Sequence, residues 1–144
     1  MNQPSLEKET MQTNRAIAML VDDMFFAAKI RGAAGSAGCE VRAVKALEQI
    51  EEEFASNPPA LFLLDLNSQK FDPLSTIQFL KSHAVLNTIP IVGFLSHVQI
   101  DLKRQAEAAG CDFVIPRSKC SQLLPQLVAG DLSGLSSSPR SSHL

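Results

Sequence analysis

Four large apolar residues followed by a carboxylate form the stretch Leu61-Phe62-Leu63-Leu64-Asp65. An unbroken apolar run of this length suits a strand that is covered on both faces, as in a parallel sheet. Other short runs have the same character, and one alternating run is typical of an edge strand. The expected strands are residues 16–21, 40–44 (the edge strand), 61–64, 89–95 and 113–115.

Stretches with apolar residues at helical spacing separate these strands. The expected helices are residues 25–37, 44–54, 73–83, 100–109 and 121–128, with Gly110 as a helix stop and Pro125 as a disturbance in the last. Five β-α units in alternation predict an α/β fold, a flavodoxin-like doubly wound sheet. Its five parallel strands would have the order 2-1-3-4-5, with helices on both faces. Function is then expected beyond the carboxyl ends of strands 1 and 3, where the strand order reverses.

Length and composition exclude several classes of protein. The 144 residues suit one domain, and 45% apolar content is too high for an intrinsically disordered chain. A net charge of −2 without a basic stripe argues against a nucleic-acid partner. Because no apolar run approaches about 18 residues, neither a transmembrane helix nor a membrane partner is expected. The polar N-terminus lacks a secretory signal, so the expected location is cytoplasmic.

The chain divides into three parts by composition. We expect a flexible N-terminal arm at residues 1–13, a compact domain at residues 14–129 and a disordered Ser-rich tail at residues 130–144. Three cysteines, Cys39, Cys111 and Cys120, have no CxxC spacing. We therefore expect them to be reduced and buried, and a zinc site is not expected.

Carboxylates follow two strands that are neighbours in the predicted sheet. Asp22 and Asp23 follow the first strand, and Asp65 ends the third. Three carboxylates in one crevice repel one another unless a cation is present, and Mg²⁺ prefers such oxygen ligands. The alternative is that these acids only end strands and cap helices, and Asp23 suits an N-cap before Met24. Because Asp22 and Asp23 follow one strand and Asp65 ends its neighbour, the pattern favours a cation site over the capping alternative.

The chain resembles the receiver domain of two-component response regulators. The resemblance is carried by Leu20-Val-Asp-Asp23, Leu63-Leu-Asp-Leu-Asn67, Lys70-Phe-Asp-Pro73, Ile89-Pro90-Ile91 and Ala108-Ala-Gly-Cys-Asp112, and it covers nearly all of residues 14–128. It implies that Asp65 is a phosphoacceptor. It also implies a Mg²⁺ site formed by Asp22, Asp23, Asp65 and the backbone carbonyl of Asn67.

Three positions depart from the pattern of that family. Leu95 occupies the usual Thr or Ser position, since Ser96 comes one residue late and would lie on the opposite face of the strand. Arg117 occupies the usual Lys position, where its planar guanidinium replaces a compact ammonium. Val114 occupies the usual aromatic position. We therefore expect an atypical, degenerate receiver.

The resemblance implies a stand-alone receiver module in phosphorelay signal transduction, acting through protein–protein interaction and not as an enzyme. Its partners would be a sensor histidine kinase or phosphotransfer protein and a downstream protein, and a homodimer stays open. The alternative is a phosphorylation-independent pseudo-receiver scaffold, which Leu95 and Arg117 favour. A small phosphatase with an aspartate nucleophile is disfavoured, because Asn67 stands where a DxD arrangement needs its second carboxylate.

Overall fold

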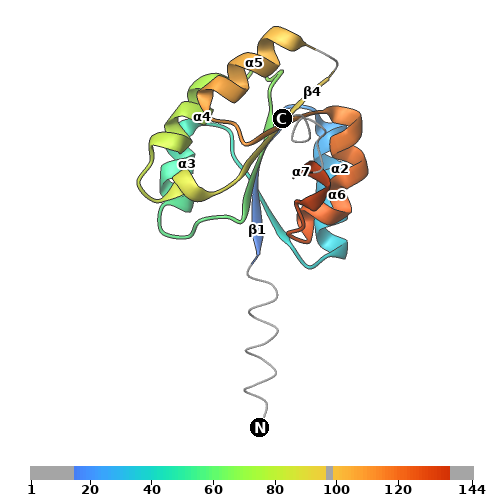
Figure 1. The fold of residues 1–144 in the computed structure, drawn as a ribbon. Helices are drawn as coiled ribbons and strands as arrows, with labels where there is room; N and C mark the ends of the chain where they lie inside the picture. The colour runs from blue at the N-terminus through green and yellow to red at the C-terminus, as the bar shows by residue number, and fades with distance from the viewer. Residues whose placement is uncertain (1–14, 97–98, 137–144) are drawn as a thin grey trace.

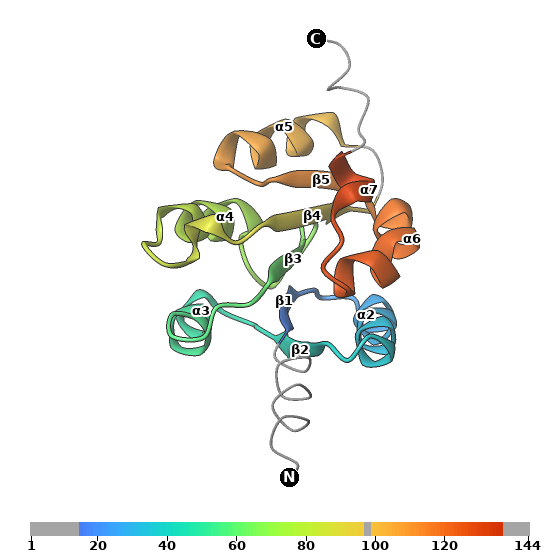
Figure 2. The ribbon, with the colours of Figure 1, turned by 60° about the horizontal axis from the view of Figure 1, so that its bottom comes forward.

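The computed structural model describes residues 15–96 and 99–136. Within them, one sheet of five parallel strands has the order β2-β1-β3-β4-β5 (Figures 1 and 2). The strands are β1 (Ala16–Leu20), β2 (Glu40–Ala43), β3 (Leu61–Asp65), β4 (Ile91–Leu95) and β5 (Phe113–Pro116). The predicted fold class and strand order are confirmed, and β2 is an edge strand as expected.

Helices cover both faces of this sheet. One face carries α2 (Met24–Ser36) and α6 (Arg117–Val128), and the other carries α3 (Leu47–Phe54), α4 (Pro73–Ser82) and α5 (Ile100–Ala109) (Figure 2). A 3₁₀ helix, η1 (Leu86–Thr88), precedes β4, and a short helix, α7 (Ser133–Ser136), follows α6. No helix in the described ranges is long and apolar enough to span a membrane.

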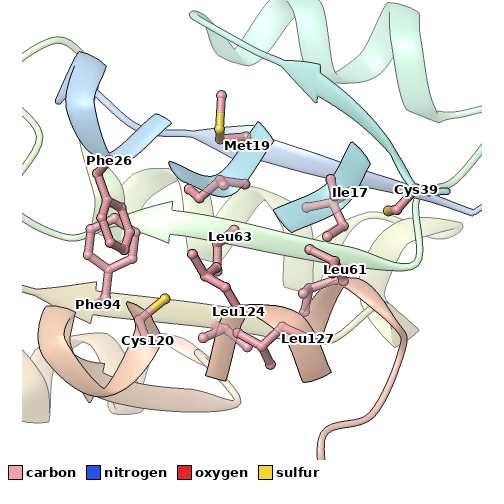
Figure 3. Close-up of a cluster of buried hydrophobic side chains, with 14 of the residues drawn as sticks. Ile17, Met19, Phe26, Cys39, Leu61, Leu63, Phe94, Cys120, Leu124 and Leu127 are labelled. Atoms are coloured by element: carbon pink, nitrogen blue, oxygen red, sulfur yellow. The ribbon is translucent and has the colours of Figure 1, made fainter. Parts of the chain in front are cut away.

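The sheet separates two apolar clusters. Successive strand residues point to opposite faces, so Ile17 and Met19 of β1 pack toward α2 and α6, whereas Ala18 and Leu20 pack toward α3, α4 and α5. Figure 3 shows the first cluster, in which Leu124 of α6 lies over the central strands. Burial on both faces explains why the central strands are continuous apolar runs.

The three cysteines are free and buried, as expected. Burial raises the pKa of both Cys111 and Cys120 to about 12, so both remain thiols at neutral pH.

Two element boundaries differ from the sequence prediction. β4 begins at Ile91 and not at residue 89, because Ile89 is the C-cap of the preceding 3₁₀ helix and Pro90 has no N–H for the strand ladder. The last helix begins at Arg117, four residues earlier than predicted, and continues through Pro125. Arg117 is thus the first residue of α6, immediately after β5.

The C-terminal segment also differs from the prediction of a disordered tail from residue 130. Residues Ser133–Ser136 form α7, and Leu135 is only 4% exposed within the cluster beneath α6. Asp131 caps the turn, accepting hydrogen bonds from the N–H and the hydroxyl of Ser133. The apolar side chain of Leu135 indicates this packing, and the Ser-rich composition around it led to the prediction of disorder. The predicted N-terminal arm (1–13) and residues 137–144 lie outside the described residues.

Candidate functional site

The strand register brings several predicted site residues to one edge of the sheet. Asp65 is the partner of Phe94, and Leu95 is the partner of Pro116. The carboxyl ends of β1, β3 and β4 and the start of α6 therefore meet at this edge. Asp22, Asp23, Asp65 and Arg117 all stand there.

Asp65 ends β3 and is almost fully buried, at 3% exposure. One of its oxygens, Oδ1, accepts the backbone N–H of Asn67 at 2.9 Å. Burial raises the pKa of Asp65 above its ordinary value of 3.8, and the charge of Asp22 adds to the rise. The backbone N–H groups of Asn67 and Asp22 and the charge of Arg117 oppose it in part.

Asp22 binds the loop that follows β3. Its Oδ1 accepts the hydroxyl of Ser68 at 2.8 Å, and its Oδ2 accepts the backbone N–H of Gln69 at 2.8 Å. The Ser68 hydroxyl in turn accepts the N–H groups of Lys70 and Phe71. Both carboxylate oxygens of Asp22 therefore hold one tight turn in place.

Asp23 is the N-cap of α2, as the capping alternative predicted. Its Oδ1 accepts the N–H groups of Phe25 and Phe26, at 2.8 and 3.2 Å. Its Oδ2 accepts Nη1 of Arg117 at 2.5 Å. The hydrogen bond from Arg117 is the largest cause that lowers the pKa of Asp23, and the capped N–H of Phe26 comes next.

Arg117 lies against a pair of aromatic rings and is also held by Asp23. Its guanidinium carbon lies 5.3 Å from the ring centre of Phe26 and 5.8 Å from that of Phe94. The two rings are 4.8 Å apart, and Figure 3 shows them together at one end of the core. Arg117 thus pairs with Asp23 and not with Asp65. Sequence reasoning missed both rings, because nothing local links Phe26 to Phe94.

Asn67 joins two loops through its side chain. Its Oδ1 accepts the backbone N–H of Ser96 at 2.7 Å, and its Nδ2 donates to Oε1 of Gln99 at 2.8 Å. Sequence reasoning assigned only the backbone carbonyl of Asn67 and missed Gln99. His97, between Ser96 and Gln99, lies outside the described residues.

Leu95 lies on the α5 side of the sheet, in the core. It is 4% exposed at the end of β4, whereas Ser96 is exposed. Val114 packs against the same cluster, and both residues line a small cavity of about 180 Å³ beside Ile100. An apolar side chain therefore fills the place where a receiver would carry its hydroxyl.

The residues present do not fit a Mg²⁺ ion in this arrangement. In residues 15–96 and 99–136, no group of three or more His, Cys, Asp or Glu side chains is placed to hold a metal. The expected convergence of Asp22, Asp23 and Asp65 is therefore not seen. Asp22 turns to the loop after β3, and Asp23 turns to Arg117. Both oxygens of Asp22, both oxygens of Asp23 and Oδ1 of Asp65 already accept hydrogen bonds from the protein.

Comparisons with known proteins find structural neighbours only. No protein-family model and no curated protein matches the sequence. The phosphorylated cyanobacterial phytochrome response regulator RcpA is similar at 23% identity and a TM-score of 0.68, over 85% of this chain and 94% of its own. The signal receiver domain of a histidine kinase from Syntrophus aciditrophicus is similar at 18% identity and a TM-score of 0.69, over 86% of this chain and 94% of its own. The Mn²⁺-bound response regulator Rcp1 is similar at 18% identity and a TM-score of 0.65, over 86% of this chain and 96% of its own.

These structural neighbours are response regulator receiver domains, and the chain shares their fold. The coverage is nearly complete on both sides, so the likeness applies to the whole domain and not to one motif. At identities below one quarter it establishes the fold and leaves the activity to be argued from the site.

Proposed function

We propose that this chain is a receiver-type signalling module that acts by binding another protein, as a phosphorylation-independent pseudo-receiver. One observation carries the proposal: Arg117 pairs with Asp23 and lies against two rings. A cation of the protein itself therefore occupies the Asp23 carboxylate of the acid site. A cytoplasmic location, without a nucleic-acid or membrane partner, belongs to the same proposal. Its support is the composition of the chain.

The contacts of Arg117 oppose the entry of a second cation. A divalent ion approaching Asp23 meets a guanidinium that already donates to Oδ2, and the two positive charges repel. Each ring contributes a cation–π attraction of about 0.5–1 kcal/mol to holding the guanidinium there. Phosphoryl transfer depends on positioning and on neutralised charge, so an acid site committed to Arg117 is poorly prepared for it.

Leu95 removes a second requirement for a phosphorylation-driven switch. A hydroxyl at this position would donate a hydrogen bond to a charged phosphoryl oxygen, worth about 1.5–3 kcal/mol. Moving a two-state equilibrium almost completely needs about 5.5 kcal/mol of differential binding. The buried side chain of Leu95 offers no such bond. A large share of the driving force for switching is therefore missing.

A second candidate function is phosphoryl acceptance on Asp65, with a sensor histidine kinase or phosphotransfer protein as donor. The position of Asp65 at the carboxyl end of β3, beside Asp22, favours it, and the neighbour RcpA is a phosphorylated protein. In this case Asp22, Asp23, Asp65 and the carbonyl of Asn67 would hold Mg²⁺. Arg117 would have to leave Asp23 first.

Labelling with a small phosphodonor separates the two candidates. The protein is incubated with phosphoramidate and Mg²⁺ beside an ordinary receiver domain, and intact mass is read. Transfer would form an O–P bond on Asp65 as the P–N bond breaks and ammonia leaves. We expect the ordinary receiver to gain a phosphate and this chain to gain none.

Variants make the labelling result specific. Arg117→Lys combined with Leu95→Thr restores the usual residue types, and we expect this double variant to gain a label that a further Asp65→Asn change abolishes. A phosphate on the wild-type chain that Asp65→Asn removes would overturn the pseudo-receiver proposal in favour of the second candidate.

A further inference from the structure

An open cavity of about 440 Å³ lies between α2 and α6, two helices that run side by side on one face of the sheet (Figure 2). Its lining consists of two cations, three hydroxyl side chains and one ring: Lys29, Arg117, Ser96, Ser118, Ser121 and Phe26. No acidic side chain is among these lining residues. The cavity is therefore a positively charged, donor-rich hollow.

Lys29 and Ser121 connect the two walls of this cavity and keep donors to spare. Nζ of Lys29 donates to Oγ of Ser121 at 3.1 Å. The ammonium has three donor hydrogens, and the Ser121 hydroxyl that accepts this bond still has its own O–H to donate. Both groups can therefore donate to the same anion without breaking their contact.

Arg117 adds to the positive character of the cavity. Its Nη1 is used by Asp23, while its Nε is buried and has no hydrogen-bond partner among the described residues. Asp23 offsets the charge of Arg117, which leaves the charge of Lys29 as the uncompensated one at the cavity wall. The charge of Lys29, with the donors that Lys29 and Ser121 keep to spare, is therefore what the cavity offers to an anion.

The N-terminus of α6 lies at the same place. Its N-cap residue, Pro116, makes no side-chain capping bond, and Ser118 stands in the first turn of this 12-residue helix. The first N–H groups of a helix have no intrahelical acceptor and carry a partial positive charge. These N–H groups add to the positive character that the side chains give the cavity.

We propose that this cavity binds a phosphate-type oxyanion, either inorganic phosphate or the phosphate of a small monoester. Lys29 and the hydroxyls of Ser118 and Ser121 would be its ligands, and a tetrahedral anion has oxygens enough to accept from all three. The proposal is independent of whether Asp65 accepts a phosphoryl group, because none of these three side chains belongs to the acid site.

A titration followed by amide NMR tests the site on the full chain. The ¹⁵N-labelled protein is titrated with sodium phosphate at constant ionic strength, and in a second arm with O-phosphoserine. We expect saturable shifts centred on residues 29, 118 and 121. Binding in the phosphate arm alone identifies a free oxyanion as the ligand, and binding in both arms extends it to monoesters.

Two matched variants decide whether the anion occupies the cavity. We expect Lys29→Gln to weaken phosphate binding about tenfold, since a charge-assisted bond is lost. Lys45→Gln removes another exposed cation, which lies outside the cavity lining, and should leave binding unchanged. Asp65→Asn should also bind as the wild type does, which separates this site from the acid site.

Three results would overturn the proposal. The first is shifts that grow without saturation and are reproduced by chloride. The second is equal weakening by Lys29→Gln and Lys45→Gln, which would indicate general charge attraction. The third is loss of binding in Asp65→Asn with the amide spectrum otherwise intact, which would move the anion to the acid site.

Discussion

Two aspartates cap helices in the same way and differ in what their second oxygen contacts. Oδ1 of Asp23 accepts the N–H groups two and three residues on, and Oδ1 of Asp72 does the same at the start of α4. Oδ2 of Asp72 accepts the hydroxyl of Ser75, three residues away. Oδ2 of Asp23 accepts Arg117, 94 residues away.

The difference shows how a local cap becomes part of a site. Both caps have a lowered pKa, with Ser75 as the largest cause at Asp72 and Arg117 as the largest cause at Asp23. The first arrangement holds one turn of helix together. The second joins the start of α2 to the start of α6 through the ion pair of Asp23 and Arg117. The same residue type therefore makes only local contacts in one place and also joins two distant helices in the other.

Removing the charge of Arg117 should have the largest effect, because this charge is what makes the Asp23 cap differ from the Asp72 cap. Arg117→Met keeps an apolar stem against Phe26 and Phe94 and frees Oδ2 of Asp23 from its ion pair. We expect the affinity for Mg²⁺ or Mn²⁺ to rise at least about tenfold, because a competing charge-assisted bond is gone. Isothermal titration calorimetry measures the change.

The control for this effect is Arg104→Met, which removes an exposed cation from α5. It should leave metal affinity as in the wild type. Unchanged affinity in Arg117→Met would mean that the acid site is not limited by this ion pair.

Alanine at each cap compares the two aspartates by stability. Asp72→Ala removes a cap and should lower Tm by about 3 °C. Asp23→Ala removes a cap and also leaves Arg117 without its carboxylate, so we expect a loss about twice as large. Thermal unfolding followed by circular dichroism at pH 7 gives both values.

Asparagine sharpens this result, because its side-chain oxygen still caps a helix. Asp72→Asn should be close to the wild type, whereas Asp23→Asn should keep the cap and lose the ion pair, giving an intermediate Tm. Equal losses in the two alanine variants would contradict the additional role of Asp23.

The contribution of Asp65 to stability should change with pH in the opposite sense to the contributions of the caps Asp23 and Asp72. Its raised pKa means that the folded state binds a proton more tightly than the unfolded state, so stability falls as the pH rises from 3.8 through the folded pKa. Asp65→Asn removes this penalty and should raise Tm at pH 7 by about 2 °C, with no gain below pH 3.8. Unfolding curves at both pH values measure it, and a lower Tm at pH 7 would contradict the burial argument.

Most of the fold follows from patterns that are short in sequence. Unbroken apolar runs gave the central strands, and the alternation of strands and helices gave the strand order. Gly110, with φ of 114°, ends α5 as expected, since that conformation favours glycine. The Asp23 cap was equally visible, because its bonds reach only two or three residues.

The arrangement of the site could not be predicted in the same way. Sequence placed Asp22, Asp23 and Asp65 at the correct edge of the sheet, but it expected their carboxylates to converge on one ion. The structure instead turns Asp22 to Ser68 and Gln69 and turns Asp23 to Arg117. The choice depends on which donors lie nearest after folding, and no spacing along the chain encodes it.

The residues alone were therefore enough for the sheet, its strand order, the acidic edge and the Asp23 cap, because periodicity and capping act over a few residues. Only the tertiary structure decided the pairing of Arg117, the bridge made by Asn67 and the burial of Leu135. Each of these contacts joins elements that are far apart in the chain. Their geometry exists only once the sheet has brought the strand ends and helix starts together.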